Sequence, residues 1–503
     1  MRLSRVLWVL LLPVAVFAQL PDTVWTRGYE AYYDSTTSLV SITGTQDNGL
    51  AVVGYCCRQD TINLCDALLL KANADGQFQW SEHIAGGGVD VFDGVTPTRD
   101  GGFFACGHTS LAGLGWMVLA VKYSAAGDTE WVRTTNPHGS MVTDALELAG
   151  GDLVATGELI GPPSYSGAPG LVRFTPQGDT LFTRRYPHSD PVHWGSAFSD
   201  ARSAVETRDQ GVLLMTGING GSVWRHDCTY LVRTNAEGDS MWTRTLCLWG
   251  QDSTVMPLDI CRADSDSYMM AAAVPSPDSA SEALLLLVKL NDLGDTVWTR
   301  TYDFPDYSLM AGGAASPVQI VHDPSGGFVV SATYFEWPSQ RSVGTLIKVD
   351  LEGAFLWMGT YSMGQPLTQA NHLSLAADST YLWLLQDNYY ADHPQKVLRL
   401  HADSANAAPP PPLHPVATFR LMQNYPNPFN PSTEIAFELP REMRVTLKVF
   451  DVLGREVARL KDGVMAAGEH RIVFDGTNLP SGVYFYRMDT NQYVQTRKML
   501  LLK

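Results

Sequence analysis

Twelve histidines and 52 Asp and Glu residues give the chain many side chains that could act as acids, bases or metal ligands. Their spacing matches no compact catalytic pattern: HExxH, GxSxG, GxxxxGK[ST] and a GxGxxG before a helix are all missing from the sequence. Only His188 and His193 lie close together in one segment, and we interpret them as loop surface residues. We therefore predict no catalytic residue, no metal site and no cofactor.

Aromatic residues, mixed with Arg and His, gather in the long irregular segments 158–170, 187–200, 219–229, 249–257, 334–342 and 387–395. Loops that a rigid scaffold presents are common binding surfaces, and such side chains suit a glycan or a protein ligand. The candidate binding residues are Tyr165, Trp194, Trp224, Arg225, His226, Trp249, Trp337, Tyr389 and Tyr390. The alternative is that these rings only pack the loops onto the body of the protein.

Seven cysteines fit an oxidising compartment without forming a disulfide scaffold. Cys228 and Cys247 flank one predicted hairpin, so they are candidates for a cross-strand disulfide. Cys65 brackets a second loop with Cys56, or with its neighbour Cys57. The alternative for each pair is a set of buried free thiols.

The formal net charge is −17, and its distribution is uneven. Residues 416–503 hold 12 Lys and Arg against 9 Asp and Glu, a net charge of +3, which leaves −20 for the rest. This acidic body argues against nucleic acid as a partner, because phosphate binding needs clustered Lys and Arg. Residues 1–18 read as a signal peptide, with Arg2 and Arg5 before an apolar stretch and a small residue, Ala18, at the cleavage point. We expect no transmembrane segment in the mature chain.

Two signatures alternate along the chain and set its architecture. The first is a turn followed by an aromatic residue, and it recurs every 51 to 60 residues, at Trp25, Trp80, Trp131, Phe182, Trp242, Trp298 and Trp357. The second is a polar turn followed by a short apolar run, as in DGGFFACGH at 100–108. A third apolar run precedes each aromatic turn from Trp80 onward, so each unit supplies about four short strands, as a blade of a β-propeller does.

The number of units predicts how the ring closes. The first aromatic turn stands alone, and the last third-strand segment, at 396–402, has no aromatic strand after it. We therefore predict a seven-bladed propeller over residues 19–403, in which strand 21–30 completes the last blade and residues 23–27 pair with residues 398–401. The aromatic anchors are expected to pack between blades.

The repeats resemble the Asp-box of sialidase-like propellers only in part, because Asp and Trp follow the Gly at a different spacing. They are more similar to propellers of exported proteins from Bacteroidetes-type bacteria, a resemblance that implies no activity.

Residues 404–418 contain four consecutive prolines, and we predict a stiff linker there. Residues 419–503 then alternate apolar and polar residues in short runs, as strands with one buried face do, and predict a small Ig-like β-sandwich. This part closely resembles the C-terminal sorting domain of type IX secretion. The residues that carry the resemblance are Asn424, Tyr425, Pro426, Asn427, Pro428, Phe429, Asn430, Pro431, Gly454, Arg455, Gly482, Tyr484 and Lys498.

The resemblance implies that the type IX translocon and sorting machinery are partners, and that the protein is secreted or held on the cell surface. Two functions remain open for the all-β body. One is a non-enzymatic binding or structural propeller, and the alternative is a secreted hydrolase that acts on polysaccharide.

Overall fold

The structure is a computed structural model of the 503-residue chain, and it describes 22 segments. They are 22–29, 36–57, 64–86, 88–111, 115–135, 140–161, 167–187, 201–219, 226–246, 256–275, 283–304, 307–310, 318–336, 341–363, 368–387, 395–401, 420–424, 426–439, 443–452, 454–465, 468–490 and 494–502. The predicted signal peptide and the proline-rich linker lie outside these segments. Every regular element in them is a β-strand.

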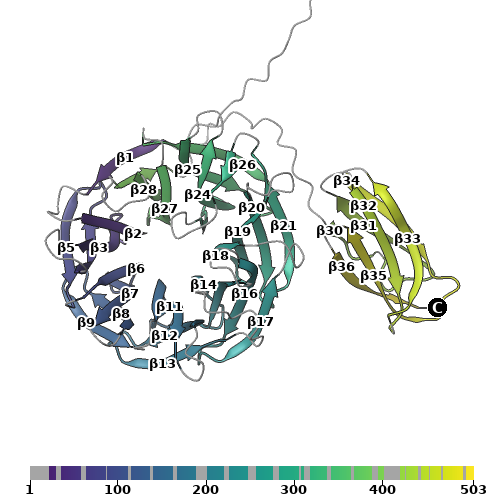
Figure 1. The fold of residues 1–503 in the computed structure, drawn as a ribbon, viewed down its shortest axis with the longest axis horizontal. Helices are drawn as coiled ribbons and strands as arrows, with labels where there is room; N and C mark the ends of the chain where they lie inside the picture. Colours follow the sequence, from purple (N-terminus) through teal and green to yellow (C-terminus); the bar gives the residue numbers. More distant parts are fainter. Residues whose placement is uncertain are drawn as a thin grey trace, which may run out of the picture.

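Seven antiparallel sheets stand around a central opening and form the blades of a propeller (Figure 1). Blade 1 consists of β2 (Thr36–Gly44), β3 (Leu50–Cys57), β4 (Cys65–Ala72) and β5 (Phe78–Ile84). Blade 2 consists of β6 (Asp90–Pro97), β7 (Phe103–Leu111), β8 (Gly115–Tyr123) and β9 (Thr129–Thr135). Blade 3 consists of β10 (Met141–Glu147), β11 (Leu153–Ile160), β12 (Gly167–Phe174) and β13 (Thr180–Arg185).

The remaining blades repeat this order with one variation. Blade 4 consists of β14 (Ala201–Glu206), β15 (Val212–Asn219), β16 (His226–Thr234) and β17 (Ser240–Leu246). Blade 5 consists of β18 (Met256–Asp264), β19 (Ser267–Pro275), β20 (Ala283–Asn291) and β21 (Thr296–Tyr302). Blade 6 consists of β24 (Phe328–Glu336), β25 (Arg341–Val349) and β26 (Phe355–Tyr361), with its inner strand divided into β22 (Tyr307–Leu309) and β23 (Gln319–His322).

Blade 7 joins the two ends of the propeller sequence. It contains β27 (Thr368–Leu375), β28 (Tyr381–Asp387) and β29 (Gln395–Leu400), and its outer strand is β1 (Thr23–Gly28). Thr26 lies opposite Leu398 and Arg27 opposite Val397 in this antiparallel pair. The predicted pairing between the N-terminal strand and the last third-strand segment is therefore observed.

The aromatic anchors pack each blade against the next, and all of them except Trp357 lie against a turn of that blade. Trp25, Trp131 and Trp242 donate their indole N–H groups to backbone carbonyls of that turn, over 2.8, 2.9 and 3.2 Å. The turn glycine beneath each of these rings has a positive φ and no room for a side chain. A Cβ on Gly294, for example, would lie 2.5 Å from Trp242. The interpretation of these anchors as packing residues is confirmed.

A basic residue of the third strand forms an ion pair with an Asp of the first turn in every blade. The pairs are Lys71–Asp47, Lys122–Asp100, Arg173–Asp152, Arg233–Asp209, Lys289–Asp264, Lys348–Asp323 and Arg399–Asp378. All these cations except Lys289 are buried. Burying a cation without a counter-charge is costly, so each blade carries its own anion at the same place.

The C-terminal part forms a separate β-sandwich. One sheet contains β30 (Arg420–Leu421), β31 (Ser432–Leu439) and β34 (Gly468–Asp475). The other contains β33 (Glu456–Met465), β32 (Met443–Phe450), β35 (Gly482–Thr490) and β36 (Val494–Leu501). Its core consists of buried residues between Leu421 and Leu501. The Ig-like sandwich predicted for this part is observed.

Candidate functional site in the central channel

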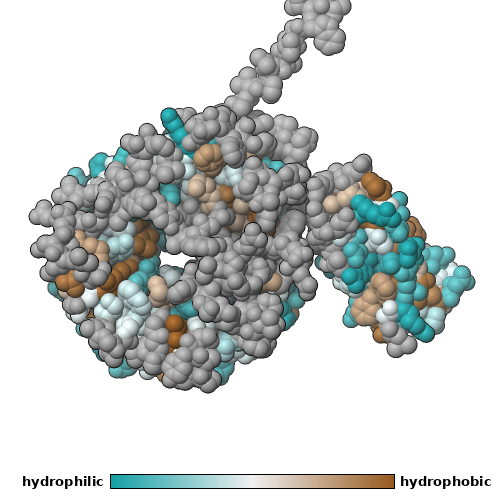
Figure 2. All heavy atoms as spheres, viewed as in Figure 1, coloured by the Kyte–Doolittle hydropathy of each residue, from teal (hydrophilic) through white to brown (hydrophobic). Residues whose placement is uncertain are grey.

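The inner strands of the blades surround an opening that remains when all atoms are drawn (Figure 2). β2, β6, β10, β14, β18 and β27 each carry a register shift at the same place. In each of these six strands we consider the residue that directly follows the register shift. In β23, Gln319 takes the equivalent position. We call this set the channel ring: Ser41, Gly94, Asp144, Ser203, Asp259, Gln319 and His372.

The two acidic members of the channel ring connect neighbouring blades. Asp144 accepts a hydrogen bond from the backbone N–H of Ala204 in the next blade at 3.0 Å, and one from Ala145 at 2.9 Å. Asp259 accepts in the same way from Ile320 of the next blade at 2.8 Å and from Ile260 at 2.8 Å. Each carboxyl group therefore binds an N–H group on the inner edge of the following blade.

Other members of the ring make related contacts without a carboxylate. Gln319 accepts a hydrogen bond from the backbone N–H of Leu373, and His372 lies 3.2 Å from the hydroxyl group of Ser41. Gly94 has no room for a side chain, because a Cβ there would lie 3.0 Å from the backbone nitrogen of Ala145. The ring position is thus a contact between blades in most of the propeller.

The electrostatics distinguish the acidic members from the rest. Burial raises the pKa of Asp144 to about 7, with a further contribution from the charge of Asp259. Burial also raises the pKa of Asp259 to about 6, and lowers the pKa of His372 to about 4. Asp144 and Asp259 remain partly exposed to solvent although protein surrounds them. Two coupled carboxyl groups that titrate near neutral pH can supply an acid and a base to one ligand.

An Asp–His pair lies in blade 2. The Nδ1 atom of His108 is 2.7 Å from the carboxylate of Asp93, which occupies the register shift of β6. The imidazole ring also contacts Trp116 edge to face, with ring centroids 4.9 Å apart. Trp116 is one of the exposed large apolar residues of the propeller, so this cluster offers an aromatic surface beside a polar pair.

Sequence reasoning missed the channel ring, although a signal for it exists. Each ring residue lies nine residues before the residue that opens the second signature's apolar run: Leu50, Phe103, Leu153, Val212, Tyr268, Phe328 and Tyr381. An alignment of the inner-strand segments on that residue would have shown a column of mostly polar residues. The prediction relied on the aromatic turns and left these segments unaligned.

The predicted binding residues of the irregular loops fall almost entirely outside the described segments. This applies to Tyr165, Trp194, Trp224, Arg225, Trp249, Trp337, Tyr389 and Tyr390, and also to His188 and His193. His226 is described by its backbone alone, as the first residue of β16, opposite Asn219. Their role in binding remains a prediction.

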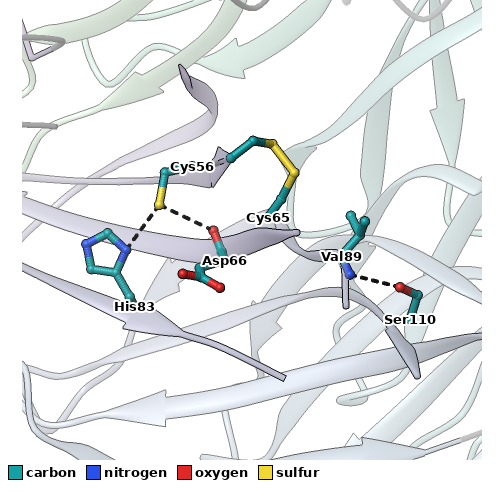
Figure 3. The surroundings of a disulfide bond; sticks show 7 residues. Cys56, Cys65, Asp66, His83, Val89 and Ser110 are labelled. Carbon is teal, nitrogen blue, oxygen red and sulfur yellow. Dashed lines mark hydrogen bonds between the residues drawn. A yellow bond between two sulfur atoms is a disulfide. The ribbon is translucent and has the colours of Figure 1, made fainter. Parts of the chain in front are cut away.

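The disulfide prediction for blade 1 needs a correction, because the bond joins Cys57 to Cys65 and leaves Cys56 as a free thiol (Figure 3). Cys57 lies directly opposite Cys65 in the β3–β4 pair, whereas Cys56 faces Asp66. Successive residues of a strand point to opposite faces, so Cys56 is turned into the protein, where its Sγ lies 3.2 Å from Nδ1 of His83. Cys228 is disulfide-bonded, and Cys247 lies outside the described segments.

The residues at the start of the C-terminal sandwich build its structure. Asn424 is buried, and its backbone N–H donates to the hydroxyl oxygen of Tyr486 at 2.8 Å. Phe429 is a core residue whose backbone N–H donates to the carbonyl of Leu500 at 2.9 Å. These contacts tie the segment to β35 and β36. The cis peptide bonds Asn427–Pro428 and Asn430–Pro431 lie on either side of Phe429.

The other residues of this resemblance lie in turns and strands of the same sandwich. Gly454 has a φ of 77° in the turn between β32 and β33, and Arg455 beside it forms an ion pair with Asp451 at 2.7 Å. Tyr484 is buried and donates its hydroxyl group to the carbonyl of Pro480 at 2.8 Å. Gly482 begins β35, and Lys498 lies opposite Phe485 in β36. Tyr425 lies outside the described segments.

Comparison with known proteins identifies the C-terminal part. Residues 423–502 match the family model of the secretion system C-terminal sorting domain, so this part of the chain is a type IX sorting domain. The protein is accordingly exported to the cell surface or secreted. In the described segments, no helix has the length and apolar character that a membrane crossing needs.

Solved structures with similar folds were also found. An α-L-arabinofuranosidase from Fusarium graminearum, bound to an iminosugar inhibitor, is 10% identical with a TM-score of 0.44, and the match covers 62% of this chain and 93% of that one. An α-L-arabinanase from Penicillium chrysogenum, bound to arabinobiose, is 11% identical with a TM-score of 0.43, over 61% and 91% of the two chains. An endo-arabinase from Bacteroides thetaiotaomicron is 9% identical with a TM-score of 0.35, over 52% and 93%.

No curated protein matches the sequence. Within the described segments, no group of three or more His, Cys, Asp or Glu side chains could hold a metal ion.

Proposed function

We propose that this exported propeller acts on polysaccharide, and that the channel ring is its active site, with Asp144 as the proton donor and Asp259 as the base. One observation carries the proposal. The two carboxyl groups share the ring position two blades apart, both remain partly exposed, and burial raises their pKa values to about 7 and about 6.

The chemistry follows from these two pKa values. At a pH between these two values, Asp144 is the carboxyl group more often protonated and Asp259 the one more often ionised. Hydrolysis of a glycosidic bond needs one carboxyl group in each of these states, one to protonate the leaving oxygen and one to assist the attack. The sorting domain supports this proposal only in that it directs export, and an exported hydrolase can reach extracellular polysaccharides.

The test is a reducing-sugar assay of the full chain on a panel of polysaccharides, including arabinan, across pH 5 to 8. We expect activity with a maximum between pH 6 and pH 7, and a loss of about a hundredfold or more in Asp144→Asn and Asp259→Asn. Asp75→Asn, in an exposed turn, is the matched control and should keep the activity. The same rate in all variants, or no hydrolysis of any polysaccharide, contradicts the proposal.

A second candidate is a binding or structural propeller without catalysis. The observation that favours it is that Gln319 and His372 also connect blades from the same ring position, so the two carboxyl groups could serve as structural contacts alone. In that case Asp144→Asn lowers the melting temperature, and the chain binds glycans on an array without cleaving them. The predicted loop residues, such as Trp224 and Trp337, would then be the ligand contacts to mutate first.

A further inference from the structure

The outer strands of the propeller carry a second set of basic residues, distinct from the buried cations. In β1, β9, β13, β17 and β21 an Arg stands two residues after the aromatic anchor. We call these five residues the rim arginines: Arg27, Arg133, Arg184, Arg244 and Arg300. Their strands lie on the outer circumference of the disc, and β9, β13, β17 and β21 belong to four consecutive blades (Figure 1).

Four of the rim arginines stack on the aromatic ring of their own strand. The distances from the guanidinium carbon to the ring centroid are 5.6 Å for Arg133, 5.1 Å for Arg184, 5.6 Å for Arg244 and 5.7 Å for Arg300. Stacking holds the planar group in one orientation and reduces the entropy that a long side chain loses when it binds. The N–H groups that make no contact with the protein can meet an anion.

The rim arginines differ from the buried cations in their partners. Each buried cation of the third strand has a carboxylate, whereas within the described segments none of the rim arginines forms an ion pair. Their hydrogen bonds go to backbone carbonyls, as from Arg133 to Gly178 at 2.8 Å and from Arg244 to Thr243 at 3.3 Å. In a body with an excess of acidic residues, this row of cations has no carboxylate partner among the described side chains.

The chemistry of the guanidinium group indicates the class of ligand. The exposed threonines next to the arginines, Thr134 and Thr243, point to the opposite face of their strands, so the arginines themselves must make the contacts. Stacked guanidinium groups bind carboxylate, sulfate or phosphate through two N–H groups at once, and their remaining N–H groups can donate to sugar hydroxyls. The ligand that fits is long, hydroxylated and repeatedly anionic.

We propose that the outer rim of the propeller binds acidic polysaccharide through the rim arginines, one contact per blade. A single exposed contact of this kind is weak, so affinity depends on one chain reaching several blades. Duplex nucleic acid fits less well, because it requires clustered cations and the propeller body is acidic overall. The site is separate from the channel ring, so the proposal does not depend on hydrolysis.

The experiment measures binding of polygalacturonate to the full chain, with neutral dextran and duplex DNA as comparison ligands. We expect polygalacturonate to bind and dextran not to bind. The triple variant Arg184→Gln/Arg244→Gln/Arg300→Gln should weaken binding about tenfold, and raised salt should weaken it as well. Hydrolysis by the channel ring, measured in parallel, should not change.

A substitution that should strengthen binding provides the matched control, since a variant that fails to fold would not bind more tightly. β5 of blade 1 has its anchor, Trp80, but carries Glu82 where five other outer strands carry Arg, and Glu82 is exposed. Glu82→Arg should extend the row and strengthen binding of polygalacturonate about twofold or more. The proposal is overturned if the triple variant binds as well as the parent, if Glu82→Arg has no effect, or if DNA binds more tightly with the same dependence on these residues.

Discussion

The seven repeated ion pairs allow one prediction in which the same interaction is tested at different depths. The side chain of Asp323 is 0% exposed and that of Asp47 is 54% exposed, yet both pair with a buried Lys. We compare Asp323→Asn with Asp47→Asn. Each change removes one negative charge and keeps the shape of the side chain.

The contacts that each Lys keeps determine how much stability each substitution is expected to remove. Without Asp323, Lys348 keeps the hydroxyl group of Ser325, at 2.7 Å, and its charge stays buried. Without Asp47, Lys71 keeps the carbonyl of Ala72 and the side chain of Gln79, at 2.9 and 3.1 Å, and solvent reaches the vacated position. We expect the free energy of unfolding to fall by about 3 to 5 kcal/mol in Asp323→Asn and by about 1 kcal/mol or less in Asp47→Asn.

The assay is unfolding in guanidinium chloride, followed by tryptophan fluorescence, with the midpoints of all variants compared. The double variant Asp323→Asn/Lys348→Met removes the unpaired charge as well, and should recover most of the stability that Asp323→Asn loses. Equal losses in the two single variants, or no recovery in the double variant, would refute the reasoning from burial.

Three further predictions concern the channel, the blade contacts and the disulfide. The raised pKa of Asp144 means that the folded protein holds a proton which the unfolded chain releases near pH 4, so the fold loses stability through this group as the pH rises toward 7. The free energy of unfolding of Asp144→Ser minus that of the parent, measured in urea, should therefore rise by about 2 to 3 kcal/mol from pH 5 to pH 8. A difference that stays constant with pH would contradict the assignment. Gly294→Ala should cost about 2 kcal/mol more than Gly326→Ala in thermal unfolding, because a Cβ meets Trp242 at the first position and nothing within 4 Å at the second, although φ is positive at both. Cys57→Ser should free the thiol of Cys65 for labelling and cost about 2 to 3 kcal/mol, whereas Cys56→Ser should leave the disulfide intact in peptide mapping.

The features of the fold that repeat as visible residue types were predictable from the sequence. The aromatic anchors indicated the blade count, and the unmatched half-units at 21–30 and 396–402 indicated the ring closure that Thr26 and Leu398 now show. Residue types alone could not predict the disulfide, because the choice between Cys56 and Cys57 depends on which face of β3 each residue occupies.

The candidate site was harder to predict for a physical reason. Asp144 and Asp259 are ordinary residues in the sequence, and their raised pKa values arise only when neighbouring blades enclose them. The ion pairs posed the same difficulty, since Lys348 and Asp323 are 25 residues apart and become partners through the register of the sheet. Composition and local spacing cannot report a contact of this kind.

The pairing of β1 with β29 makes the first strand of the propeller the last that can dock. Until residues 395–400 have been made, β1 has blade 1 to contact through Trp25 but no strand to pair with, and the disc is an open crescent. A molecule trimmed beyond Gly28 would leave β29 as a bare edge, which could accept the same strand from another copy. Damage to one short strand at the start of the propeller would therefore convert a closed ring into a strand-exchanged assembly.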